Sequence, residues 1–260
     1  MSTLSFAVKY MRPLPFFLML AWSVISFSQD KQLDSLREVL LNQAEDTSQV
    51  NILNEMAALS YRSAPNESIN YSSDARSLAE KLNFRRGLAE AYKNIGLGHY
   101  MQGNYTEAYK SWELSLDIFR ELGNDQLVSN LLGNLGSIYY TMGKNLEAID
   151  YNIQALKIAE KLGDSTRIGT IMLNIGNVYS EQPATLDNAR DYYLQSLEIG
   201  ESIGYRDLLA LGSINLGEVY FKQEKYDSAL FFFEKSLLYV DSQIDKAASL
   251  GNIGRTYAEK

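Results

Sequence analysis

The sequence contains no cysteine and only one histidine, His99. Without cysteine the chain can form no disulfide scaffold, cysteine-rich zinc site or iron–sulfur cluster, and it has no thiol nucleophile. His99 has no second histidine, no His-Glu-x-x-His run and no calcium-loop spacing to complete a metal site. These absences predict that the protein holds no metal and no cofactor.

Clusters of basic residues are also missing. The formal net charge is -8, from 24 lysines and arginines against 32 aspartates and glutamates. Neutralising phosphates requires clustered basic side chains, so this balance argues against nucleic acid or an anionic membrane surface as the main partner. The carboxylates are spread along exposed helix faces, and no phosphate-binding glycine loop is present. No catalytic acid–base pair can be selected, and the sequence predicts a protein that is not an enzyme.

The N-terminus has the layout of a signal peptide. Lys9 and Arg12 precede the apolar run Leu14 to Phe27, and polar residues follow Ser28. The run is shorter than the roughly 20 residues that a membrane-spanning helix needs. We therefore expect residues 1–28 to be removed during export. Retention of this segment as an N-terminal anchor is the alternative.

One short motif recurs along the chain, with asparagine two residues before glycine and an apolar residue between them. It appears as "KNIGLGH", "GNLGSIY", "LNIGNVY", "INLGEVY" and "GNIGRTY". Its glycines lie about 40 residues apart, which is the signature of a repeat architecture. They are Gly96, Gly136, Gly176, Gly217 and Gly254. A weaker copy, "MAALSY", places Ala58 in the glycine position.

A second apolar-periodic stretch follows each motif after a short polar turn. Small residues recur there seven apart, which is two helical turns, so that each pair shares a face. The pairs are Ala108 and Ser115, Ala148 and Ala155, Ala189 and Ser196, and Ala229 and Ser236. Three stretches end at Gly123, Gly163 and Gly204, where glycine can close a helix in the left-handed conformation. Each unit therefore reads as helix, turn, helix, and no strand pattern appears.

These residues resemble the tetratricopeptide repeat (TPR) family, in its longer form of about 40 residues. The family pattern of Leu-Gly-x-x-Tyr in the first helix matches Leu135, Gly136 and Tyr139, and its small, aromatic and small positions match Ala108, Trp112 and Ser115. The usual early tryptophan and closing proline are absent. The resemblance implies an all-α, right-handed α-solenoid of stacked antiparallel helix pairs.

The repeat divides the chain into seven segments after the signal peptide. We expect a capping helix within residues 29–49 and the first helix of a truncated sixth repeat at 246–260. The complete repeats are predicted at residues 50–87, 88–125, 126–165, 166–206 and 207–245.

The glycine and the asparagine of the motif have different predicted roles. A missing side chain lets the two helices of a unit approach closely, and the packing gained offsets glycine's cost of about 1 kcal/mol in a helix. The asparagines form a polar ladder, because they recur at one angular position. The resemblance implies that this ladder faces the concave groove and hydrogen-bonds the backbone of an extended peptide, since an amide offers donors and an acceptor. Bonding between neighbouring repeats is the open alternative.

The predicted peptide-binding set combines the ladder with its neighbours one turn away on the same helices. Their mixed character suits a peptide or protein segment. The set is Asn94, Asn134, Asn174, Asn215, Asn252, Lys93, Leu97, Tyr100, Tyr140, Asn177, Glu218 and Phe221. His99 occupies a tyrosine slot and is predicted to pack.

The signal peptide, the leading helix and the repeats together resemble the exported N-terminal TPR region of bacterial signalling proteins. This resemblance implies a periplasmic module that binds a protein or peptide as the input to an output domain beyond Lys260. The alternative is a structural scaffold that self-associates through exposed repeat ends.

Overall fold

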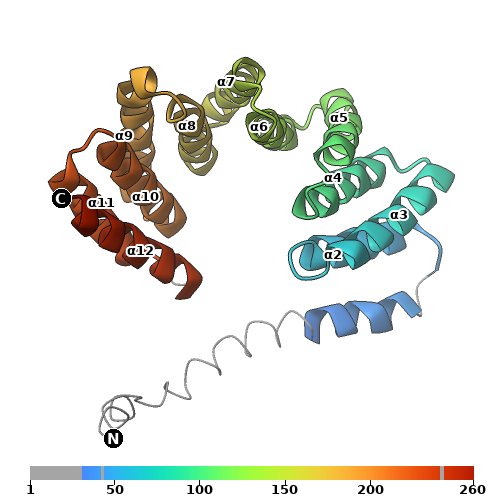
Figure 1. Cartoon of the computed structure of the whole chain (residues 1–260). Helices are drawn as coiled ribbons and strands as arrows, with labels where there is room; N and C mark the ends of the chain where they lie inside the picture. The colour runs from blue at the N-terminus through green and yellow to red at the C-terminus, as the bar shows by residue number, and fades with distance from the viewer. Residues whose placement is uncertain (1–30, 42–43, 241–242) are drawn as a thin grey trace, which may run out of the picture. The chain divides into compact units, whose positions relative to one another are not determined.

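The computed structural model describes residues 31–41, 44–240 and 243–260, and the fold is all helical over these ranges, as predicted (Figure 1). The predicted signal peptide, residues 1–28, lies outside the described residues. The chain forms two compact units, Met1–Gly103 and Asn104–Lys260. Their boundary falls at the turn inside the predicted second repeat.

Unit 1 contains a helix over residues 31–41 and three longer helices. Asp46 begins the first of these by accepting hydrogen bonds from the backbone N–H groups of Ser48 and Gln49, and Pro65 occupies the first turn of the next. The three are α2 (Thr47–Ser60), α3 (Pro65–Lys81) and α4 (Arg85–Met101).

The helix over residues 31–41 covers the first helix pair. Its Leu33 is buried, and its Leu40 packs against the core cluster that contains Val50 and Leu53. Arg37 donates hydrogen bonds to Glu67 and Tyr71 of α3. The helix lies within residues 29–49, the range for which the sequence predicts a capping helix.

Unit 2 repeats the helix pair along its length. Its helices are α5 (Tyr105–Glu121), α6 (Asp125–Thr141), α7 (Asn145–Leu162), α8 (Ser165–Tyr179), α9 (Leu186–Ile203), α10 (Arg206–Lys222), α11 (Tyr226–Leu237) and α12 (Gln243–Glu259), with a 3₁₀ turn at Pro183–Thr185. Each pair begins slightly before the predicted start of its repeat. No helix within the described ranges is long and apolar enough to cross a bilayer.

The helices that carry the Asn-x-Gly motif, here called A helices, form one side of unit 2. In Figure 1 the A helices α6, α8 and α10 follow this side, while the partner B helices α7, α9 and α11 follow the other. The A helices of successive repeats contact each other, α6 with α8 and α8 with α10. This arrangement brings the recurring motif positions side by side.

Glycines close the helices as the sequence predicts. Gly123, Gly163 and Gly204 follow B helices and have φ values of 67°, 67° and 66°. Gly103 and Gly143 do the same after A helices. The left-handed conformation carries little steric cost for glycine, so each helix can end sharply and the chain can reverse.

The predicted packing residues are buried, and the motif glycines face a side chain of the B helix. All four pairs of small residues seven apart are fully buried. A Cβ built on Gly176 would lie 2.5 Å from the Tyr193 ring, and one on Gly217 would lie 2.5 Å from the Phe233 ring. A Cβ on Gly136 would collide with Asn152 in the equivalent slot. At these three positions the glycine therefore makes room for a B-helix side chain.

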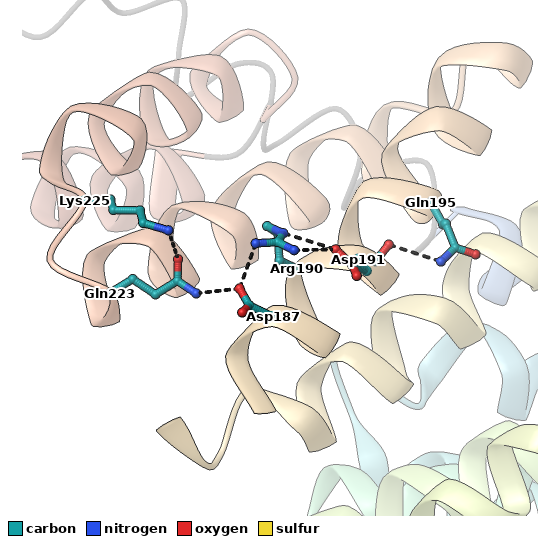
Figure 2. A network of polar contacts seen from close by, with 6 residues as sticks. All are labelled: Asp187, Arg190, Asp191, Gln195, Gln223 and Lys225. Atoms are coloured by element: carbon teal, nitrogen blue, oxygen red, sulfur yellow. Dashed lines mark hydrogen bonds and ion pairs between the residues drawn. The ribbon is translucent and has the colours of Figure 1, made fainter. Parts of the chain in front are cut away.

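A surface network ties the fourth repeat to the fifth (Figure 2). Asp187 of α9 accepts hydrogen bonds from Arg190 at 2.7 Å and from Gln223 at 3.2 Å, and Gln223 in turn accepts one from Lys225. Gln223 and Lys225 flank the turn between α10 and α11. Because these groups are mostly exposed, the network fixes geometry more than it adds stability.

Candidate functional site

The ladder asparagines of unit 1 are committed to contacts between repeats. Asn94 of α4 is only 1% exposed, and its Nδ2 donates to the backbone carbonyl of Asn54 in α2 at 3.0 Å. Its Oδ1 is buried without a hydrogen-bond partner among the described residues. The sequence left open whether the ladder asparagines bond to a neighbouring repeat. The side-chain NH₂ group of Asn94 does so.

Asn54 is a ladder residue that the sequence analysis missed. Its Nδ2 donates to the carbonyl of Gly87 at 3.0 Å, and it lies beneath Asn94. Asn54 and Asn94 both line a pocket of about 470 Å³ between α2 and α4. Asn54 lies 40 residues before Asn94, which equals the repeat period and could have identified it. The sequence pattern instead places Ala58 in the glycine position of the first repeat, and this register puts Met56 in the asparagine position.

The other unit 1 positions of the predicted set also lie on α4. Lys93 pairs with Glu90 one turn earlier on the same helix, and both line the pocket. Leu97 and Tyr100 are half-buried. His99 is also half-buried, and its Nδ1 is buried without a partner among the described residues.

In unit 2 the A helices bring the predicted residues onto one surface, here called the A-helix face. It consists of Asn134 and Tyr140 of α6, Asn174 and Asn177 of α8, Asn215, Glu218 and Phe221 of α10, and Asn252 of α12. All eight are half-buried. The side chains of Asn134 and Asn174 make no hydrogen bond with any residue in the described ranges.

A chain of hydrogen bonds runs from the core to this face through Asn177. The buried Tyr193 hydroxyl donates to Asn177 Oδ1 at 2.7 Å, and Asn215 Nδ2 donates to the same oxygen at 3.0 Å. Asn177 and Asn215 thereby link α8 to α10. The bond between them leaves the NH₂ group of Asn177, the second N–H of Asn215 and one amide acceptor, Asn215 Oδ1.

Charged groups on the A-helix face already have partners within the protein. The Tyr140 hydroxyl donates to Glu181 at 2.6 Å, and Lys222 donates to the carbonyl of Ser180 at 2.8 Å. Burial, with a smaller contribution from Glu181, raises the pKa of Tyr140 to about 12, so its hydroxyl stays protonated at neutral pH.

Arg255 of α12 continues this pattern towards the last helix. It pairs with Glu218 at 2.5 Å, and its guanidinium lies 4.2 Å from the centre of the Phe221 ring. Both partners belong to the predicted binding set, which the structure therefore connects from α10 to α12.

Arg167 of α8 is a second residue that the sequence did not indicate. Its guanidinium is half-buried and lies over Gly133 of α6, 3.9 Å from where a Cβ would stand. Burial lowers the pKa of Arg167, against a smaller opposing effect from Asp164. No ion pair to this guanidinium occurs among the described residues. Nothing in the repeat pattern marks the position, because only the fold places Arg167 beside Gly133.

The described side chains form no cluster of three or more histidine, aspartate or glutamate residues that could bind a metal ion. The side chains gathered on the A-helix face are instead amides, paired charges and aromatic rings. Chemically, this arrangement can offer hydrogen bonds and apolar contact to a ligand.

A family model described as a tetratricopeptide repeat matches three overlapping stretches, residues 87–161, 127–183 and 168–237. Together they cover more than half of the chain. No curated protein matches the sequence.

Solved structures share the fold at low sequence identity. BtubC from P. vanneervenii is 20% identical, with a TM-score of 0.65 over 86% of this chain and 90% of that one. Aspartyl phosphate phosphatase F from Bacillus subtilis is 12% identical, with a TM-score of 0.64 over 90% and 68%. The Rap conjugation gene regulator of plasmid pLS20, in complex with the Phr* peptide, is 15% identical, with a TM-score of 0.62 over 92% and 71%.

Proposed function

Because the chain belongs to the tetratricopeptide repeat family, we propose that it is a non-catalytic interaction module that binds an extended peptide or protein segment along the A-helix face of unit 2. The amides of Asn134, Asn174, Asn177 and Asn215 would hydrogen-bond the ligand backbone. Tyr140 and Phe221 would supply apolar contact.

The observation that carries this proposal is that some polar groups on or beside this face are bonded within the protein, whereas others have no hydrogen-bond partner in the described part of the chain. Glu181, Glu218 and Lys222 are engaged inside the protein. The amides of Asn134 and Asn174 have no partner in the described part of the chain. Because leaving amides without partners is costly once water is displaced, a ligand that covers this face must supply donors and acceptors. A peptide backbone carries both at every residue.

Structures of the same fold support a peptide as ligand. The pLS20 regulator was solved in complex with the Phr* peptide, and another Rap protein was solved in complex with the competence and sporulation factor. Both are under 25% identical to this chain, so they support a peptide-binding role by analogy of fold.

The test is a selection of random 12-residue peptides displayed on phage, with the full chain as bait. Selected peptides are then titrated against the double variant Asn134→Ala, Asn174→Ala by fluorescence anisotropy. We expect affinity to fall at least about fivefold, since each of the two lost hydrogen bonds contributes roughly 0.5–1.5 kcal/mol. The melting temperature should not change.

The matched control is Asn188→Ala, an exposed asparagine of the B helix α9, which should bind like the wild type. Selection of no peptide, or equal affinity in the double variant, would contradict the proposed function. Loss of helicity in the double variant would instead assign both asparagines to stacking.

We also propose that the chain is exported and acts as the periplasmic input region of a bacterial signalling protein. The charged and apolar pattern of residues 9–28 supports export. Fusing residues 1–30 to alkaline phosphatase without its own leader in a Gram-negative bacterium tests this, because the enzyme is active only after export. An inactive fusion would contradict export.

Self-association is a second candidate function, and the face of α12 favours it. A Cβ on Gly254 would meet nothing within 4 Å, whereas the equivalent glycines of α8 and α10 face a B-helix ring. Leu250 and Tyr257 of the same helix are exposed. Light scattering across a concentration series tests this candidate, and a constant monomer mass would exclude it.

A further inference from the structure

We propose that Tyr193 is a positioning residue that locks Asn177 and Asn215 into a donor–acceptor pair, and that this pair binds one C=O and one N–H of a peptide backbone. This inference rests on the proposed function, because it assigns the ligand chemistry of one part of the A-helix face.

The Tyr193 hydroxyl is not required for packing. Its side chain is 1% exposed and fills the space beside Gly176. In the next repeat Phe233 fills the same space beside Gly217 with no hydroxyl at all. Packing therefore does not require the hydroxyl, whose hydrogen bond goes to Asn177 Oδ1.

The bond to Tyr193 decides which atoms of Asn177 remain available. Its Oδ1 accepts from Tyr193 on the core side and from Asn215 on the neighbouring helix, so both of its lone pairs are used. An amide held by two bonds through one atom cannot rotate freely about its terminal torsion, and the NH₂ group is held opposite to that oxygen. Asn177 therefore presents donors only.

Asn215 has the complementary arrangement. One N–H of its Nδ2 is used in the bond to Asn177, and its Oδ1 has no partner among the described residues. The two linked side chains thus offer a donor on α8 and an acceptor on α10. A peptide backbone satisfies both at once, whereas a carboxylate satisfies only the donor and an ammonium group only the acceptor.

The surrounding charges favour a neutral group at this point. Lys222 is bonded to the Ser180 carbonyl beside the pair, and Glu218 is paired with Arg255. Both charges therefore already have a partner within the protein. Recognition by Asn177 and Asn215 is therefore expected to depend on the ligand backbone and to tolerate different side chains.

The variant Tyr193→Phe isolates the hydroxyl, because phenylalanine already fits the equivalent slot in the next repeat. The matched control is Tyr192→Phe, which removes a hydroxyl that bonds to no described residue while keeping the stack on Tyr179. Circular dichroism should show the same helicity and similar melting temperatures for both variants.

Two measurements by nuclear magnetic resonance on the ¹⁵N-labelled full chain complete the test. The first follows the side-chain NH₂ signals of Asn177 and Asn215 in the free protein. In Tyr193→Phe we expect these signals to shift and broaden, and in Tyr192→Phe to stay in place. Unchanged Asn177 signals in Tyr193→Phe would overturn the positioning role without any ligand present.

The second measurement titrates the peptide acetyl-tetraalanine-amide, and an analogue whose backbone nitrogens are methylated. The unmodified peptide should shift the Asn177 and Asn215 signals, and Tyr193→Phe should weaken its binding about threefold to tenfold, which is the range expected for one hydrogen bond. Methylation should weaken binding to the wild type by removing the N–H donors.

The outcomes separate the two proposals. If the peptide shifts Asn134 and Asn174 but binds Tyr193→Phe as tightly as the wild type, the positioning role is overturned and the proposed function stands. If the peptide shifts none of the four amides in the wild type, the proposed function itself fails, and the ligand assignment fails with it.

Discussion

Asparagine recurs at one position of the repeat but does different work in different repeats. Asn94 is buried and bonded to the repeat before it, Asn215 is bonded to Asn177, and Asn134 and Asn174 have no partner in the described chain. The repeat period places all of these residues on equivalent turns. Burial and the local neighbours then decide whether each amide is structural or available to a ligand.

Glu224 occupies a position that favours glycine. It follows α10 with φ 59°, where Gly103 and Gly143 follow the equivalent helices. A side chain in the left-handed region costs roughly 1–2 kcal/mol, part of which the greater chain entropy of glycine offsets. We expect Glu224→Gly to raise the free energy of unfolding by about 0.5–1 kcal/mol, measured by urea denaturation. Gly143→Ala is the converse control and should lower it, and a destabilised Glu224→Gly would contradict this account.

At the scale of the element, the antiparallel pair depends on a glycine that faces a large side chain. The sequence predicts close approach and small partners, and the small residues are indeed buried. The ring that fills the space beside Gly176 or Gly217 comes from the position that the family pattern assigns to an aromatic residue. The third repeat departs from this, because Asn152 takes that place and leaves its Oδ1 buried without a described partner.

Gly217→Ala and Gly254→Ala should have opposite effects on stability. A Cβ on Gly217 would overlap Phe233, which is fully buried and cannot move away, and overpacking of this kind costs about 1–3 kcal/mol. The same substitution at Gly254 meets open space and gains up to about 1 kcal/mol of helix propensity.

Thermal unfolding of both variants checks this prediction. We expect a lower melting temperature for Gly217→Ala and an equal or higher one for Gly254→Ala. Equal changes in the two variants would show that intrinsic helix propensity, and not contact with Phe233, decides the effect.

At the scale of the whole molecule, tyrosines with raised pKa values are expected to contribute to the pH dependence of stability at alkaline pH. Burial is the main cause that raises the pKa of several tyrosines above their usual 10.0, with neighbouring carboxylates or phenols adding to it. These are Tyr109, Tyr140, Tyr151, Tyr192, Tyr193 and Tyr205. In the unfolded chain the same phenols ionise near pH 10.

The stability that these phenols contribute is therefore fully present below about pH 10 and is lost as the pH rises above it, because the unfolded state releases its protons first. We expect the melting temperature to fall between about pH 10 and pH 12. Phenolate absorbance at 295 nm should appear at higher pH in the folded protein than in urea. Coincident titration curves would contradict the raised pKa values.

The sequence by itself determined the repeat, the helix pairs, the capping glycines and the buried small residues. All of these follow from local spacing: a period of about 40 residues, a helical face and a left-handed turn are encoded within one repeat. For the same reason the sequence could place Asn134, Asn174 and Asn215 on equivalent turns.

Only the tertiary structure decided which polar groups are hydrogen-bonded within the protein and which are available to a ligand. Whether an amide is available depends on residues of the neighbouring helices, such as Asn54 beneath Asn94 or Tyr193 behind Asn177. Arg167 lies over Gly133 for a similar reason, since their contact joins two repeats. Hydrogen bonds form between atoms that packing brings within about 3 Å, and a repeat pattern specifies equivalence between turns but not those distances.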